Sequence, residues 1–113
     1  MVSVIEVNVL QSYIKGVMKR VDHHGPNVDE VIFALAGAIV WKKDHDKNIE
    51  VRAIKGRMGN VPWVHIANKP YAFSYNHETG NIEMRKNNLQ GQTLHTFNNS
   101  TSISEIREAF QSL

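Results

Sequence analysis

The spacing of apolar positions changes along the chain from a helical period to a strand period. From Val7 to Val21, apolar residues recur every three or four positions, which is typical of one face of a helix. Ser3 to Glu6 has the S-x-x-E pattern of a capping box at the start of this stretch. Alternating valines between positions 2 and 9 favour a strand instead, but the helical period extends further. The pattern therefore predicts a first helix.

A second helix is expected after a breaker segment, Asp22 to Pro26. It opens with an N-x-x-E start at Asn27 to Glu30, and apolar residues at helical spacing continue to Ile39. Gly37 lies inside this stretch, where glycine costs on the order of 1 kcal/mol relative to alanine. It marks either close packing against the first helix or the end of the second. We place the end near Lys43.

The remainder of the chain predicts strands and one more helix. From position 49 the period is two, and short turns rich in Gly and Asn separate the apolar segments as in hairpins. The expected strands are Ile49–Lys55, Val61–Ala67, Pro70–Tyr75 and Ile82–Lys86, with a fifth candidate at Thr93–Phe97. A capping box at Ser102 to Glu105 opens a C-terminal helix whose apolar stripe is Ile103, Ile106, Phe110 and Leu113.

These elements predict the fold class. It is α+β, with two N-terminal helices, an antiparallel four- to five-stranded meander sheet and a C-terminal helix, all in a single α+β domain over residues 1–113. A chain of 113 residues with 42% apolar residues can bury one continuous core without disulfides.

Three strand registers agree on which residues share a buried face. We pair Ile66 with Tyr71 around a turn at Asn68-Lys69, Tyr75 with Ile82, and Val51 with Val64. The residues then expected to be buried together are Val51, Val64, Ile66, Phe73 and Met84. By alternation, the opposite face contains Glu50, Arg52, Trp63, His65, Ala72, Ser74, Glu83 and Arg85.

That opposite face is the candidate binding surface, made of Glu50, Arg52, Trp63, His65, Ser74, Glu83 and Arg85. A solvated sheet face with cross-strand ion pairs is the commoner explanation of such alternating charge. Trp63 does not fit that explanation, because a large indole ring is unfavourable when fully exposed to water. The ring is therefore expected to be covered by one of three partners: the Arg52 side chain through cation–π stacking, a ligand or a second subunit.

Two functions remain open on this basis. The leading hypothesis is a non-catalytic binding or interaction module of unknown ligand, a homodimer or higher oligomer. Its interface is either the outer sheet face, in which case Trp63→Ala shifts the protein toward monomer, or the helical face built by Val7, Ile14 and Val21. The alternative is a small metal-independent acid–base enzyme, acting for example on RNA, in which Glu50 orients His65 as the general base. Arg85 would then bind an oxyanion or phosphate. No residue is assigned as catalytic.

Composition excludes several other chemistries. The absence of cysteine excludes thiol catalysis, Cys-ligated zinc and disulfides. The pair His23-His24 and the triplet Asp44 to Asp46 flank the second helix, whose ~1.5 Å rise per residue separates them by roughly 20 Å. They cannot share one site, so we expect no metal and no cofactor.

The charge pattern and the N-terminus bear on partners and location. Thirteen basic and eleven acidic residues are interleaved and leave a net charge of +2, so nucleic-acid binding is not expected. The longest apolar run, Val31 to Trp41, is too short to span a membrane, and no signal peptide is recognisable at the N-terminus. We therefore expect a cytoplasmic protein without membrane contact.

Four segments of the chain resemble a known group of proteins. The strings are GAIVWKKD (37–44), VPWVHI (61–66), YAFSYNHETGNIEMR (71–85) and NSTSISEIREAFQSL (99–113). They are similar to the uncharacterised proteins encoded by mobile integron gene cassettes of marine bacteria. The resemblance implies a bacterial cytosolic protein, dispensable to its host, with a compact α+β fold and self-association. It implies no activity and no site residues.

Overall fold

The computed structural model describes residues 11, 15–16, 18–19, 25–53 and 60–113. Its elements are α2 (Val31–Lys42), β1 (Glu50–Ala53), β2 (Asn60–Ile66), β3 (Lys69–Asn76), β4 (Asn81–Lys86), β5 (Thr93–Phe97) and α3 (Ile103–Gln111). The first expected helix lies largely outside the described residues. Among the elements of the described part of the chain, a single helix, α2, precedes the sheet, so the expectation of two helices is not met there.

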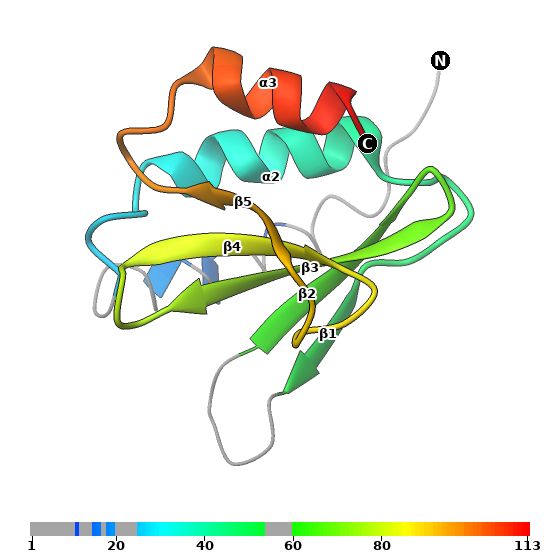
Figure 1. Ribbon diagram of the computed structural model, residues 1–113, viewed down its shortest axis with the longest axis horizontal. Coiled ribbons are helices and arrows are strands. Elements are labelled where there is room, and N and C mark those ends of the chain that lie inside the picture. The colour runs from blue at the N-terminus through cyan, green and yellow to red at the C-terminus, as the bar shows by residue number, and fades with distance from the viewer. Residues whose placement is uncertain (1–10, 12–14, 17, 20–24, 54–59) are drawn as a thin grey trace.

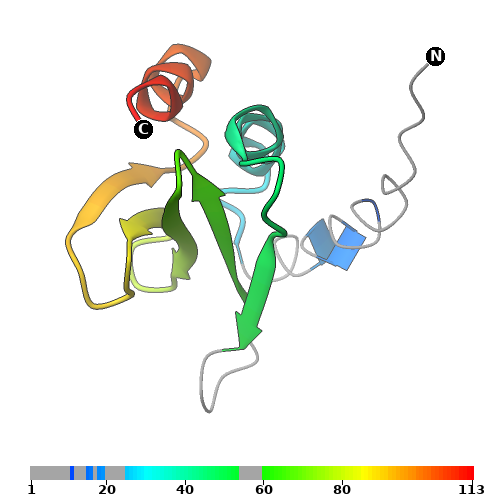
Figure 2. The same ribbon diagram turned by 90° about the vertical axis from the view of Figure 1, so that its right-hand side faces the viewer.

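The five strands form one antiparallel meander in the order β1-β2-β3-β4-β5. The fifth candidate strand is confirmed with the bounds expected for it, and the other described strand ends differ from the predicted ones by no more than one residue. The predicted end of the first strand, Lys55, lies outside the described residues. Figures 1 and 2 show α2 and α3 side by side on one face of the twisted sheet. The molecule therefore has a helical layer, a sheet, and an outer sheet face that no described helix covers.

The β2–β3 hairpin corrects the predicted turn and register. The turn residues are Ala67 and Asn68, with φ of 52° and 64°, and Ile66 pairs with Lys69 rather than Tyr71. A two-residue turn with positive φ at both positions matches the twist of the flanking strands. Such turns usually contain an Asn-Gly pair, which this turn lacks. The carboxylate of Asp44 holds this turn, because its oxygens accept hydrogen bonds from the N–H groups of Ala67 (3.0 Å) and Asn68 (2.9 Å).

The β1–β2 register is corrected in the same way. Val51 lies opposite Pro62 instead of Val64, and Glu50 lies opposite Trp63 instead of His65. The pairing of Tyr75 with Ile82 is confirmed. Both errors are shifts of two residues, and side chains alternate with a period of two, so each residue keeps its predicted face.

The core lies between the sheet and the two helices. Four of the five residues predicted to be buried together are in it: Val64, Ile66, Phe73 and Met84, each no more than 5% exposed. The fifth, Val51, has a side chain outside those described. The turn before α2 contributes Val28, and the helices contribute Val31, Leu35, Ala38, Ile106, Ala109 and Phe110. Ile103 departs from the predicted stripe of α3, because it is 78% exposed at the first helical position.

The two helices are capped differently. The predicted capping box of α3 is confirmed, since the Ser102 hydroxyl accepts a hydrogen bond from the Glu105 N–H at 3.0 Å. The N-x-x-E start of α2 is not its cap, because the Asn27 amide donates to the carbonyl of Gly80 instead. The cap comes from Asn99, whose side-chain oxygen accepts from the N–H groups of Glu30 and Val31, both at 3.0 Å.

Candidate functional site

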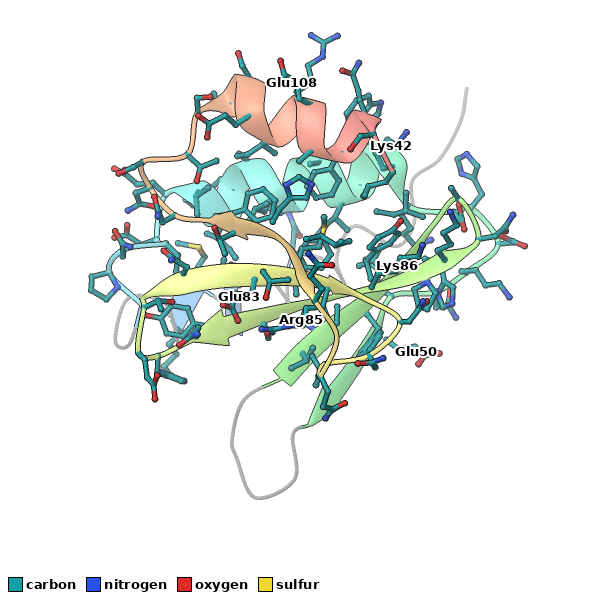
Figure 3. The ribbon with its side chains drawn as sticks, in the orientation of Figure 1. Lys42, Glu50, Glu83, Arg85, Lys86 and Glu108 are labelled. Atoms are coloured by element: carbon teal, nitrogen blue, oxygen red, sulfur yellow. The ribbon has the colours of Figure 1, made fainter. Side chains whose placement is uncertain are left out.

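The candidate binding surface lies on the outer face of the sheet, as the alternation predicts. Glu50 is exposed on β1, while His65 on β2 and Ser74 on β3 are half-buried. Glu83 and Arg85 project from β4, and Figure 3 shows both on the side of the sheet away from the helices. The backbone of Arg52 pairs with Val61, and its side chain lies outside those described.

Trp63 is buried, which contradicts the expectation of an exposed indole on this face. Only 7% of its surface is accessible, and it packs in a small cluster with Val61, Ala72 and the half-buried Leu89. Leu89 belongs to the β4–β5 connection, which is tied back to the sheet by the hydrogen bond from Asn87 N–H to the Pro70 carbonyl at 2.9 Å. The outer face thus has an apolar cluster of its own, and the indole is not a platform for stacking a base.

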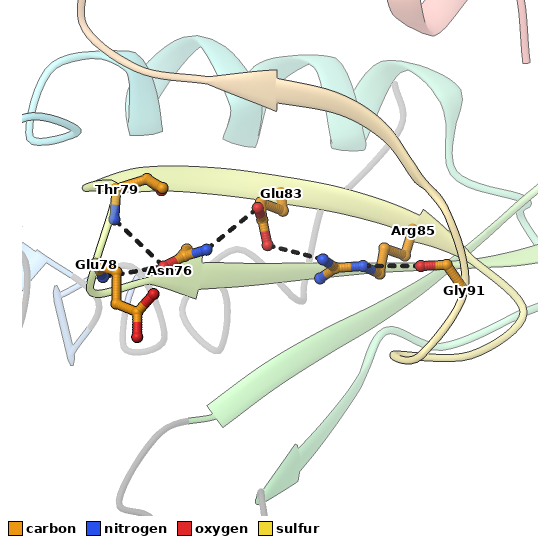
Figure 4. Close-up of polar contacts among 6 residues, drawn as sticks. All are labelled: Asn76, Glu78, Thr79, Glu83, Arg85 and Gly91. Atoms are coloured by element: carbon orange, nitrogen blue, oxygen red, sulfur yellow. Dashed lines mark hydrogen bonds and ion pairs between the residues drawn. The ribbon is translucent and has the colours of Figure 1, made fainter.

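A chain of polar contacts runs along β4 beside this cluster (Figure 4). The Asn76 amide donates to one oxygen of Glu83 at 3.3 Å, and the other oxygen lies 3.0 Å from Arg85 Nη2. Arg85 Nε donates in turn to the Gly91 carbonyl at 3.2 Å. The side chains of Arg85 and Glu83 are only 20% and 14% exposed. Since the protein itself occupies these groups, they hold the β4–β5 connection in place rather than form an open anion clamp.

The acid–base alternative depended on a cross-strand row that the structure does not contain. Glu50 stands opposite Trp63, and His65 stands opposite Pro70, so the two are not cross-strand neighbours. The Nδ1 atom of His65 is buried and has no hydrogen-bond partner among the residues that the structure describes. A general base needs a carboxylate or similar acceptor to orient its second ring nitrogen, and Nδ1 of His65 has none.

Three of the five exposed large apolar side chains among the described residues are on α2. With Gly37 they form a surface that we call the α2 stripe: Phe33, Gly37, Val40 and Trp41. Phe33 is 62% exposed, Val40 57% and Trp41 52%. Their spacing of four, seven and eight residues places them on one side of the helix, away from the buried Val31, Leu35 and Ala38. Beside the stripe, the Lys42 ammonium lies 5.4 Å from the centre of the Trp41 ring.

The α2 stripe was not among the surfaces expected from the sequence. Those expectations concerned the outer side of the sheet, the first helix and the buried side of the second helix, Val28 to Ile39. A signal was nevertheless present, because α2 is apolar on every side: no charged residue interrupts Val31 to Trp41. Such a helix is normally buried all round, so its exposure on one side is unusual.

The triplet Asp44 to Asp46 follows α2 and lines a shallow depression together with Trp41, Lys42, Lys43 and Asn68. Asp44 is engaged in the β2–β3 turn, whereas His45 and Asp46 are exposed. Among the described residues, no three His, Asp or Glu side chains come together as metal ligands. His23 and His24 lie outside the described residues.

The described part of the chain defines a class: a small α+β protein with a five-stranded antiparallel meander and two helices on one face. The family model described as "Integron cassette protein VCH_CASS1 chain" matches residues 10–107. The chain therefore belongs to this integron cassette protein family, as its four resembling segments led us to expect. Comparison with curated proteins finds no match. No helix among the described residues is long and apolar enough to cross a membrane.

Proposed function

We propose that this protein is a non-catalytic interaction module that binds a second copy of itself through the α2 stripe, and that it acts in the cytoplasm. The observation that supports the proposal is the exposure of three large apolar side chains, Phe33, Val40 and Trp41, on one side of a single helix. Large apolar side chains gathered on one surface are typical of interaction sites, and aromatic residues dominate binding energies at interfaces.

A second copy is the occupant that the charges around the stripe favour. The acidic Asp29 and Glu30 precede α2, and the basic Lys42 and Lys43 end it. The same patch on two protomers is therefore complementary to itself when the helices run in opposite directions. Symmetric dimers are also the commonest assembly of soluble chains. This changes the surface expected for self-association from the sheet to α2, since Trp63 is already covered within its own chain.

The strength of association follows from the size of the stripe. A standard interface buries roughly 800 Å² per partner, and three partly exposed side chains supply only a fraction of that. We therefore expect a dimer that dissociates in the micromolar range. Sedimentation velocity on a dilution series would show a dimer at tens of micromolar and a monomer at high dilution.

A pair of matched variants tests the surface. Phe33→Asp puts a charge into the stripe near the helix N-terminus, where an acidic residue is compatible with the helix dipole. It should yield a folded monomer at every concentration. Ile103→Asp makes the same change at the exposed first residue of α3 and should leave the dimer intact. A wild-type protein that sediments as a monomer at tens of micromolar overturns the proposed function.

A further inference from the structure

Gly37 is the least explained residue of α2. It is exposed in the middle of a 12-residue helix, and a Cβ atom added to it would meet nothing within 4 Å. Its φ lies outside the left-handed region, so the backbone does not require glycine there. Glycine costs about 1 kcal/mol in a helix interior relative to alanine. Nothing described within the protomer offsets this cost.

A close approach by another backbone would explain the glycine. Where two helices pack through small residues, their axes come nearer than the usual 8–10 Å, and the backbones themselves touch. Ala34 and Ala36, on either side of Gly37 around the helix, are both half-buried, and Ala34 packs against the core. Because these three residues are small, no large side chain projects from the helix beside Gly37. The larger side chains of the stripe stand on either side of these small residues.

The stripe is symmetric about Gly37. Phe33 lies four residues before it and Trp41 four residues after it, so each is about 6 Å along the axis from the glycine at 1.5 Å per residue. If two copies of α2 run antiparallel and cross at Gly37, Phe33 of each lies beside Trp41 of the other. A parallel pair would instead set each aromatic ring against its own copy.

The charges at the two ends of α2 select between these orientations. An antiparallel pair places Asp29 and Glu30 of one protomer at the end where the other carries Lys42 and Lys43. It also opposes the two helix dipoles, which is favourable. A parallel pair brings like charges together at both ends. Antiparallel packing is therefore the orientation that both the apolar and the charged residues support.

From this geometry we infer that two copies of the chain pack α2 against α2 in antiparallel orientation, with a two-fold axis at Gly37. The inference rests on the proposed self-association and adds its geometry. The two helices cross at Gly37. On either side of the crossing, Phe33 of one protomer contacts Trp41 of the other. An interface of this kind is isologous, so both protomers use the same residues.

Because the 113 residues include no cysteine, the geometry is directly measurable by cross-linking in this chain. A disulfide requires Cα atoms roughly 4.4–6.8 Å apart. Gly37→Cys should form a disulfide-linked dimer under mild oxidation. Phe33→Cys alone should not, because its copy would lie roughly 12 Å away along the axis. Phe33→Cys mixed with Trp41→Cys should form the mixed disulfide.

Each outcome decides the inference. Ser104→Cys, exposed on α3, is the control and should remain unlinked. A disulfide of Phe33→Cys with itself would show parallel packing and overturn the inference while leaving self-association standing. A wild-type dimer with no cross-link at position 37 would move the interface elsewhere. If the thiol of Gly37→Cys neither cross-links nor reacts with a small alkylating reagent, another part of the same chain covers α2, and the inference fails. A wild-type protein that is monomeric at tens of micromolar would contradict both this inference and the proposed function.

Discussion

The two tryptophans of this protein lie on opposite layers of the molecule and differ in how they are covered. Trp63, on the outer face of the sheet, is 7% exposed, whereas Trp41, on the outer side of α2, is 52% exposed. Each follows an apolar residue, Pro62 or Val40, and the sequence next to the two rings does not show which of them is covered. The difference comes from what the rest of the chain brings to each.

Trp63 is covered because the β4–β5 connection folds back over the sheet. The contact of Arg85 with Gly91 and that of Asn87 with Pro70 bring Leu89 into the indole's cluster. At α2, the neighbouring α3 packs beside the helix (Figure 2), and the large side chains of the stripe remain more than half exposed. An aromatic side chain can contribute to an interaction surface only where its own chain leaves it uncovered.

The largest expected effect is the loss of stability in Trp63→Ala. Removing a buried aromatic side chain leaves a cavity and costs about 3 kcal/mol or more in free energy of unfolding. Urea denaturation should show this loss, while Trp41→Ala should change the stability of the protomer by no more than about 0.5 kcal/mol. Equal losses in the two variants would contradict the distinction between a covered and an open tryptophan.

The next largest effect concerns the cap that Asn99 provides at the start of α2, the helix that carries the α2 stripe. Asn99→Ala removes the acceptor for two N–H groups at the start of α2, and also the donor to Asp29 at 2.8 Å. We expect a loss of about 1–2 kcal/mol, the usual range for a helix cap. Thermal or urea unfolding measures it, with the exposed Gln92→Ala as control. A loss no greater than the control's would mean that water replaces the cap.

Gly37→Ala should have opposite effects on the protomer and on the dimer. Within the helix it should raise the free energy of unfolding by about 1 kcal/mol, because alanine is the better helix former and its methyl group meets open space. Unfolding in the Phe33→Asp background isolates this term. In the otherwise wild-type protein, the added methyl group should hold the helices apart and raise the dissociation constant. A tighter dimer would count against close approach at Gly37.

The smallest effect belongs to the buried face of the sheet and appears only at high pH. Burial raises the pKa of the Tyr71 hydroxyl above its ordinary value of about 10. The unfolded chain therefore ionises first, so stability is unaffected below about pH 10 and falls as the pH rises above it. Tyr71→Phe should show a shallower decline of the urea midpoint in this range. Parallel declines in the two proteins would indicate that another group is responsible.

Much of this protein follows from the sequence alone. The strand period, the capping box at Ser102 and the apolar spacing of α2 determined the α+β class, the meander and the faces of the strands. The faces survived errors of two residues in the β1–β2 and β2–β3 registers, because a shift by one full period returns each side chain to the same side. The resemblance to integron cassette proteins was also recognisable from local strings, and the family match confirms it.

Only the tertiary structure decided which surfaces remain open. The turn at Ala67 and Asn68 depends on a carboxylate more than 20 residues earlier, and the cap of α2 depends on Asn99, 68 residues beyond Val31. Coverage of Trp63 and exposure of Trp41 likewise depend on segments distant in sequence. Periodicity records which side of an element is apolar, but burial is a sum over everything that packs against that side. For this reason we expected the binding surface on the sheet from the sequence, and we propose it on α2 from the fold.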